Sequence, residues 1–183
     1  MKTIIKPEVY DDLYREEQYA KYEQLLKIGI SMEGTILDAG CGTGLLFEYL
    51  SSSRKTKFQR YVCLDPDPNM LHVASNRLDR HFAILVEGYT EELPFRDKCF
   101  DVVISISTIG ALSDIQKALY ELRRVVQTNG PVVITGHPKT YSQQIHTIDR
   151  CFDFVGRFID DFYVANKRNL PDHTCTITQP TTH

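Results

Sequence analysis

The sequence predicts an α/β fold in which a doubly wound, mostly parallel seven-stranded sheet carries an antiparallel edge pair. Short apolar runs alternate with amphipathic segments of helical period along most of the 183 residues. The first apolar run breaks into a glycine-rich turn, which is typical of a strand followed by a helix. The last two runs are separated only by a tight polar link, which indicates an antiparallel pair.

Local signals place each element. Pro7 suits a first helical turn and Gly29 a helix end, so the segment between them is expected to be helical. Asp67 resembles an N-cap before Pro68, and Ser113 begins a capping-box pattern, Ser-Asp-Ile-Gln. Strands are expected at 36–38, 60–65, 82–88, 100–107, 131–136, 152–158 and 162–167, and helices at 7–28, 45–50, from 68, from 113 and at 141–149.

These elements form one domain, which we place at residues 7–169. Residues 1–6 are expected to be a flexible arm, and the polar, threonine-rich residues 170–183 a disordered tail. A chain of this length can bury a single core, and 42% hydrophobic and 25% charged residues are ordinary for a globular protein. No insertion between the elements is long enough for a separate substrate domain.

Charge, hydropathy and cysteine content limit the binding partners, metal sites and cellular location that we expect. A net charge of -3 gives no reason to expect direct binding to bare nucleic acid. No apolar run is long enough to cross a membrane, and the first ten residues lack a signal-peptide core. The five cysteines contain no C-x-x-C pair, so we expect free thiols, no metal site and a cytoplasmic location.

The segment Ile36–Gly44 organises the predicted fold and its function. Its glycines at 40, 42 and 44 let the main chain turn tightly and approach a ligand, as in a Rossmann-like nucleotide site. A dinucleotide fingerprint requires glycine or alanine at position 45, where this chain has Leu45. Asp38 would repel a pyrophosphate, but it suits a ligand that carries an ammonium and a sulfonium. A nicotinamide dehydrogenase is therefore disfavoured, and S-adenosylmethionine (SAM) is the inferred ligand.

The octet L-D-A-G-C-G-T-G, residues 37–44, resembles motif I of the class I SAM-dependent methyltransferases, in particular the methyltransferase type 11 group. The resemblance covers roughly residues 8–168. It implies a methyltransferase whose cofactor SAM is bound by this turn, with Asp38, Gly40, Cys41, Gly42 and Gly44 as the candidate residues.

A second acid is expected beside this turn. Asp65 ends the strand at 60–65 and comes 25 residues after Gly40, so it belongs at the tip of the neighbouring parallel strand. There it can accept both ribose hydroxyls of a nucleoside. Pro66 and Met70 keep the order of the family's next helix and join the candidate cofactor residues. Asp67 is the lesser ribose candidate, because helix capping explains it.

The adenine contact departs from the family pattern. Gly88 and the Leu-Pro-Phe element at 93–95 match, but Tyr89 stands where the family has an aspartate for the adenine amino group. Tyr89 could stack on adenine or offer its hydroxyl, and Thr90 could supply a backbone amide or hydroxyl. Ser105 lies at the ligand end of the strand at 100–107, whereas Asp101 lies at its start and is interpreted as structural.

The acceptor is not identified by the sequence, and small molecules, proteins and RNA stay open. A hydroxyl or carbon acceptor needs a general base, and His137 at the end of the strand at 131–136 is the candidate. A non-catalytic protein that binds SAM or a partner is the alternative. The resemblance also implies a possible small zinc-binding activator subunit on a sheet edge. Tyrosines at 10, 14, 19 and 22 could pack on the sheet or form a lid over the site.

Overall fold

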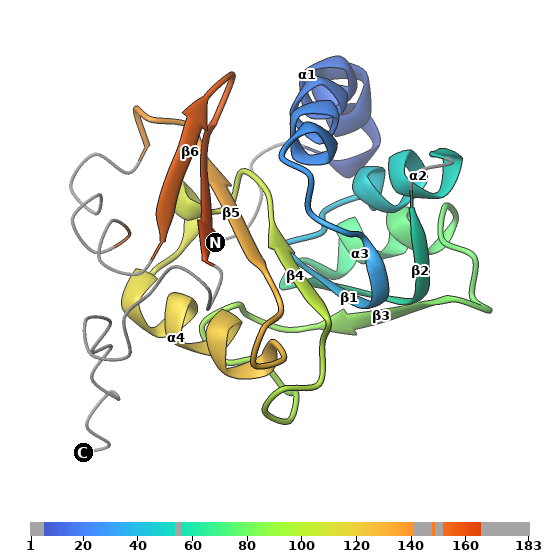
Figure 1. Ribbon diagram of the computed structural model, residues 1–183. Helices are drawn as coiled ribbons and strands as arrows, with labels where there is room; N and C mark the ends of the chain where they lie inside the picture. Colours follow the sequence, from blue (N-terminus) through green and yellow to red (C-terminus); the bar gives the residue numbers. More distant parts are fainter. Residues whose placement is uncertain (1–5, 54–55, 141–147, 149–151, 166–183) are drawn as a thin grey trace.

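A seven-stranded sheet with the strand order β3-β2-β1-β4-β5-β7-β6 forms the centre of the molecule (Figure 1). The computed structural model describes residues 6–53, 56–140, 148 and 152–165. Its elements are α1 (Pro7–Lys27), β1 (Glu33–Ala39), α2 (Leu45–Ser52), β2 (Lys57–Asp65), α3 (Pro68–Ser75), β3 (Ala83–Glu87), β4 (Val102–Ser105), the 3₁₀ turn η1 (Ile109–Ala111), α4 (Ile115–Val125), β5 (Val132–Gly136), β6 (Asp153–Arg157) and β7 (Asp161–Ala165).

The predicted fold class is confirmed. Strands β1 to β5 pair in parallel, whereas β7 pairs antiparallel with both β5 and β6. The predicted helix at 141–149 apart from Ile148, the tail and most of the N-terminal arm lie outside the described residues. Among the residues that the structure describes, no helix combines the length and the apolar composition that a membrane crossing requires.

Side chains of successive residues in each strand point alternately to the two faces of the sheet. Ile36, Tyr61 and Ile104 pack under α1, α2 and α3, and Leu37 and Val103 pack against α4. Because both faces are covered by helices, the central strands are apolar on both sides and lie fully buried. Figure 1 shows α4 separated from the other three helices by the sheet.

The strand order reverses between β1 and β4. The crossovers through α2 and α3 run outward on one face, and the crossover through α4 runs outward on the other. In open α/β sheets a ligand binds at such a reversal, beyond the carboxyl ends of the strands. The turn after β1 lies at this position.

The N-cap residue of α3 is the predicted one, whereas that of α4 comes one residue later than predicted. Asp67 is the N-cap of α3, and its side chain accepts a 2.9 Å hydrogen bond from the Asn69 N–H, as predicted. The predicted capping box at Ser113 is wrong. Asp114 is the N-cap of α4, and it accepts a 3.0 Å hydrogen bond from the Lys117 N–H. Ser113 instead donates to Glu91 across a loop.

Candidate functional site

The glycine turn has the backbone that its sequence predicts. Gly40, Gly42 and Gly44 all have positive φ values, 82°, 55° and 79°. A β-carbon on Gly44 would stand 2.7 Å from a methyl group of Leu78, so this glycine lets α2 start close to the end of α3. A β-carbon on Gly42 would meet nothing within 4 Å. Gly42 therefore leaves open space that a ligand can occupy.

Asp65 joins the tip of β2 to this turn. Its carboxylate accepts 2.9 Å hydrogen bonds from the backbone N–H groups of Gly42 and Asp67. Burial raises the pKa of the Asp65 carboxyl, and the two N–H donors oppose that rise. The side chain is thus fixed in orientation at the ligand end of the sheet.

A cavity of about 470 Å³ opens beside the turn, at the carboxyl ends of the parallel strands. This volume falls in the range of roughly 300–1,000 Å³ typical of small-molecule sites. The structure brings seven predicted cofactor residues into its wall: Gly40, Gly42, Asp65, Pro66, Met70, Tyr89 and Thr90. The opposite wall comes from the segment after β4, from Ile106 to Ser113.

A narrow recess of about 30 Å³ shares part of this wall and leads to Asp38. The Asp38 carboxylate is 2% exposed and accepts a 2.8 Å hydrogen bond from the Tyr61 hydroxyl. Burial raises the pKa of Asp38 to about 7, although the Tyr61 hydrogen bond opposes the rise. Because a neutral hydroxyl compensates a buried carboxylate only in part, this recess favours a ligand group of positive charge.

The remaining predicted site residues do not line the 470 Å³ cavity itself. Cys41 lines the recess, and burial raises the pKa of its thiol, so the sulfur stays protonated at neutral pH. Ser105 is fully buried, donates a 2.7 Å hydrogen bond to the Ala39 carbonyl and lies 2.6 Å from the Thr108 hydroxyl. Its contacts join β4 to β1. Gly44 precedes α2 and packs against α3.

His137 lies directly after β5 and is exposed. Its ring Nδ1 accepts a 3.3 Å hydrogen bond from the Lys139 N–H. The side chain does not belong to the described wall of the cavity.

A buried polar cluster behind Ser107 is absent from the sequence predictions. Ser107 lines the cavity, has a φ of 61° and donates a 2.7 Å hydrogen bond to Asp160. The Asp160 carboxylate is fully buried, accepts from Thr135 over 2.8 Å and lies 3.1 Å from the Lys21 ammonium. Lys21 also donates to Ser107 over 3.0 Å. No local pattern predicts this cluster, because its members come from four separate segments.

Tyr10, Tyr19 and Tyr22 of α1 pack against the core, and two of them also reach the site. Tyr22 is buried in the core under the helix and also lines the recess, whereas Tyr10 packs against the core and lines both the cavity and the recess. Burial raises the pKa of the Tyr10 hydroxyl to about 12, so it stays protonated. Both tyrosines therefore pack as expected, and a lid over the site stays a prediction for Tyr10.

A larger hollow of about 820 Å³ lies at the other end of the parallel strands, where they begin. It is open, and its wall includes the starts of β1 and β4 and the segment before β5. Asp101 lines it and accepts a 2.7 Å hydrogen bond from the Thr35 N–H, a structural contact as predicted. Ligands of such sheets bind at the carboxyl ends, so the smaller cavity is the candidate site.

The sheet order and the two helical layers define a protein of the doubly wound α/β class. Within it, residues 37–134 match the family model described as "Methyltransferase domain". Because the match covers more than half of the chain, the protein belongs to this family, the class I SAM-dependent methyltransferases of type 11.

Curated relatives agree with the family assignment. The malonyl-[acyl-carrier protein] O-methyltransferase of Serratia marcescens is 37% identical over 114 residues, which cover 62% of this chain and 42% of that enzyme. The Bacillus subtilis protein named "Putative methyltransferase YrhH" is 31% identical over 138 residues, 71% of this chain and 76% of YrhH. The chain thus spans less than half of the first relative and about three quarters of the second.

Solved structures show the same fold at low sequence identity. A protein of Methanococcus maripaludis has a TM-score of 0.75 at 18% identity, over 91% of this chain and 92% of that one. A chain from the complex of the Haloferax volcanii methyltransferase activator Trm112 has a TM-score of 0.64 at 20% identity, over 77% and 62%. At these identities the likeness concerns the fold alone.

Proposed function

We propose that the 470 Å³ cavity and its recess hold SAM, and that the chain transfers its methyl group to an acceptor. The observation that carries this proposal is the meeting of three features in one cavity: the open position at Gly42, the fixed carboxylate of Asp65 and the recess at Asp38. The open space at Gly42 lets the ligand approach the main chain, Asp65 suits the ribose hydroxyls, and the recess at Asp38 suits the methionine ammonium.

The adenine end fits the wall formed by Met70, Tyr89 and Thr90. Met70 and Thr90 are both buried and line the cavity, where Met70 offers an apolar surface. The Tyr89 side chain is 57% exposed at the mouth, where its ring can cover a base from the solvent side. Stacking thus supplies what the missing family aspartate would have supplied by a hydrogen bond.

The sulfonium supplies an electrophilic methyl group, and the protein contributes position and exclusion of water. Tyr10, Ile106 and Ser107 would surround the methyl position, because they lie where the turn faces the segment after β4. The acceptor would enter along Gly110 to Ser113. His137 stays a proposed base for an acceptor that loses a proton, and donor binding does not require it.

Binding of S-adenosylhomocysteine tests the donor site directly. A ligand at about 100 times its dissociation constant stabilises a fold by roughly 2.7 kcal/mol. We expect a higher melting temperature with S-adenosylhomocysteine and no change with NAD. Stabilisation by NAD alone would overturn the proposal. Transfer of a tritiated methyl group from SAM into fractions of a cell lysate would then reveal whether the acceptor is a small molecule, a protein or an RNA.

We also propose that a small zinc-binding activator subunit pairs with the edge strand β3. This strand ends the sheet, and Phe82 and Ile84 expose about half of their side chains there. An exposed apolar edge strand is a template for strand addition. The Haloferax volcanii complex with Trm112 supports the class of partner. Gel filtration of the purified chain is the test, since an active, well-behaved monomer would contradict this proposal.

A further inference from the structure

The two halves of α1 are attached to the molecule by different forces. Its C-terminal half buries Tyr22 and Leu25 in the core. Its N-terminal half leaves Val9 44% and Leu13 61% exposed and buries Asp11 instead. Apolar burial therefore fixes the second half, and polar contacts fix much of the first.

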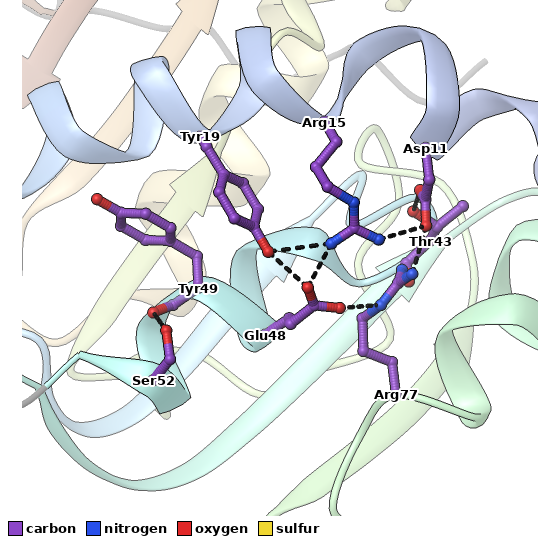
Figure 2. A network of polar contacts seen from close by, with 8 residues as sticks. All are labelled: Asp11, Arg15, Tyr19, Thr43, Glu48, Tyr49, Ser52 and Arg77. Carbon is purple, nitrogen blue, oxygen red and sulfur yellow. Dashed lines mark hydrogen bonds and ion pairs between the residues drawn. The ribbon is translucent and has the colours of Figure 1, made fainter.

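Asp11 is the centre of these polar contacts (Figure 2). One carboxylate oxygen accepts a 2.6 Å hydrogen bond from the Thr43 hydroxyl, inside the glycine turn. The other accepts from the Arg77 guanidinium and, over 3.3 Å, from Arg15. Arg77 also donates to the Thr43 carbonyl, so Asp11 holds the hydroxyl of this residue and Arg77 its carbonyl.

Glu48 on α2 completes the network. It accepts a 2.5 Å hydrogen bond from the Tyr19 hydroxyl, lies 2.5 Å from Arg77 Nε and pairs with Arg15. Figure 2 shows the two arginines between the two acids, so the charges of the cluster balance. The network thereby connects α1, the glycine turn, α2 and the segment after α3.

The network is adjacent in sequence to two walls of the cavity. Tyr10 precedes Asp11, and Gly42 precedes Thr43; both line the cavity and the recess. We propose that Asp11 and Arg77 are positioning residues that clamp the N-terminal half of α1 onto the glycine turn, so that clamping and donor binding strengthen each other. This inference rests on the proposed function. Linkage requires the effect to be reciprocal: a bound donor holds the clamp closed, and a weakened clamp lowers donor affinity.

Matched substitutions test the clamp through the affinity for S-adenosylhomocysteine. Asp11→Asn removes the charge that faces Arg77 and Thr43, and Asp12→Asn makes the same change on the exposed neighbouring residue. We expect Asp11→Asn to weaken binding about tenfold or more, because a hydrogen bond to a charged group is lost in a partly buried site. Asp12→Asn should stay within about twofold of wild type.

A second pair keeps the test informative if Asp11→Asn folds poorly. Thr43→Val preserves the shape of this buried residue but removes the hydroxyl, and Thr43→Ser keeps the hydroxyl. We expect the valine variant to lose affinity about tenfold and the serine variant to retain most of it.

Hydrogen exchange separates clamping from general stability. S-adenosylhomocysteine should protect the amides of residues 10–19 in wild type and Asp12→Asn, and this protection should be lost in Asp11→Asn while that of β1 and β4 remains. Equal affinities and equal protection in the two variants would overturn the clamp and leave the proposed function intact. A wild-type chain that fails to bind S-adenosylhomocysteine would overturn the proposed function and the clamp together.

Discussion

The carboxylate of Asp65 accepts a hydrogen bond from the Gly42 N–H over 2.9 Å, which joins the tip of β2 to the turn after β1. The same carboxylate accepts from the Asp67 N–H at the start of α3. One acid thus fixes the shape of the turn and forms part of the cavity wall. Its removal should therefore affect the ligand more than the fold, because the surrounding strands are held by their own pairing.

Asp65→Asn should weaken S-adenosylhomocysteine binding by about 10- to 100-fold, since hydrogen bonds to charged groups contribute roughly 1.5–3 kcal/mol. Asp67→Asn, two residues away, is the matched control. Asparagine is as good an N-cap as aspartate, so this variant should bind as wild type does. Titration calorimetry measures both affinities, and equal losses in the two variants would contradict a ribose role for Asp65.

The glycines of the turn should separate fold from binding. Gly42→Ala places a methyl group in open space at positive φ, at a cost of about 1–2 kcal/mol, or roughly 2–8 °C in melting temperature. Gly44→Ala pays the same backbone cost and also meets Leu78, so it should melt lower still. Only Gly42→Ala adds an atom to the cavity wall, and it should fold yet lose S-adenosylhomocysteine binding. Normal binding by a folded Gly42→Ala protein would contradict the proposed ligand position.

Asp38 should make both stability and binding depend on pH. Burial raises the pKa of this carboxyl to about 7 in the folded chain, against 3.8 ordinarily, so the folded state prefers the protonated acid. The contribution of Asp38 to stability is therefore complete below about pH 4 and is lost as pH rises through about 7. Denaturant titrations of wild type and Asp38→Asn should reveal this slope in wild type alone.

The same group should act on affinity in the opposite direction. An ammonium in the recess favours the ionised carboxylate, so S-adenosylhomocysteine binding should weaken as pH falls below about 7, by up to about tenfold per pH unit. Asp38→Asn should bind weakly at every pH between about 6 and 8, without this slope. A slope that persists in the variant would assign the titration to another group.

Tyr89 should act through its ring and not through its hydroxyl. The side chain lines the cavity mouth and is 57% exposed, a position that suits stacking on a base. Stacking of a base on an aromatic side chain contributes about 1–3 kcal/mol. Tyr89→Phe should therefore keep the affinity for S-adenosylhomocysteine, and Tyr89→Ala should lose about tenfold or more. A large loss in the phenylalanine variant would favour a hydrogen bond from the hydroxyl.

The sheet and the position of the site follow from local patterns in the sequence. Apolar runs and turn glycines depend on neighbouring residues, the Asp65 spacing depends on one strand-helix-strand unit, and all three agree with the structure. The orientation of single side chains does not follow from such patterns. Ser105 ends its strand at the ligand edge as expected, yet its hydroxyl points to the Ala39 carbonyl of the adjacent strand.

Contacts between distant segments also could not be predicted from the sequence. Asp11 is apparent in the sequence only as an acid in the first turns of a helix, where it favours the helix dipole. Its partner Arg77 follows α3, in a segment without a motif, and Thr43 is the least conspicuous member of the octet. Only the packing of α1 against α2 and α3 brings these side chains together.

The separation of Asp11 from Arg77 along the chain has a consequence for biosynthesis. Because Arg77 is 66 residues downstream, the front of α1 leaves the ribosome long before its partner exists. Chains are synthesised at roughly 5–20 residues per second, so the N-terminal half of α1 lacks its Arg77 contact for several seconds. Helix α1 therefore cannot complete its native contacts until α3 and Arg77 have been translated.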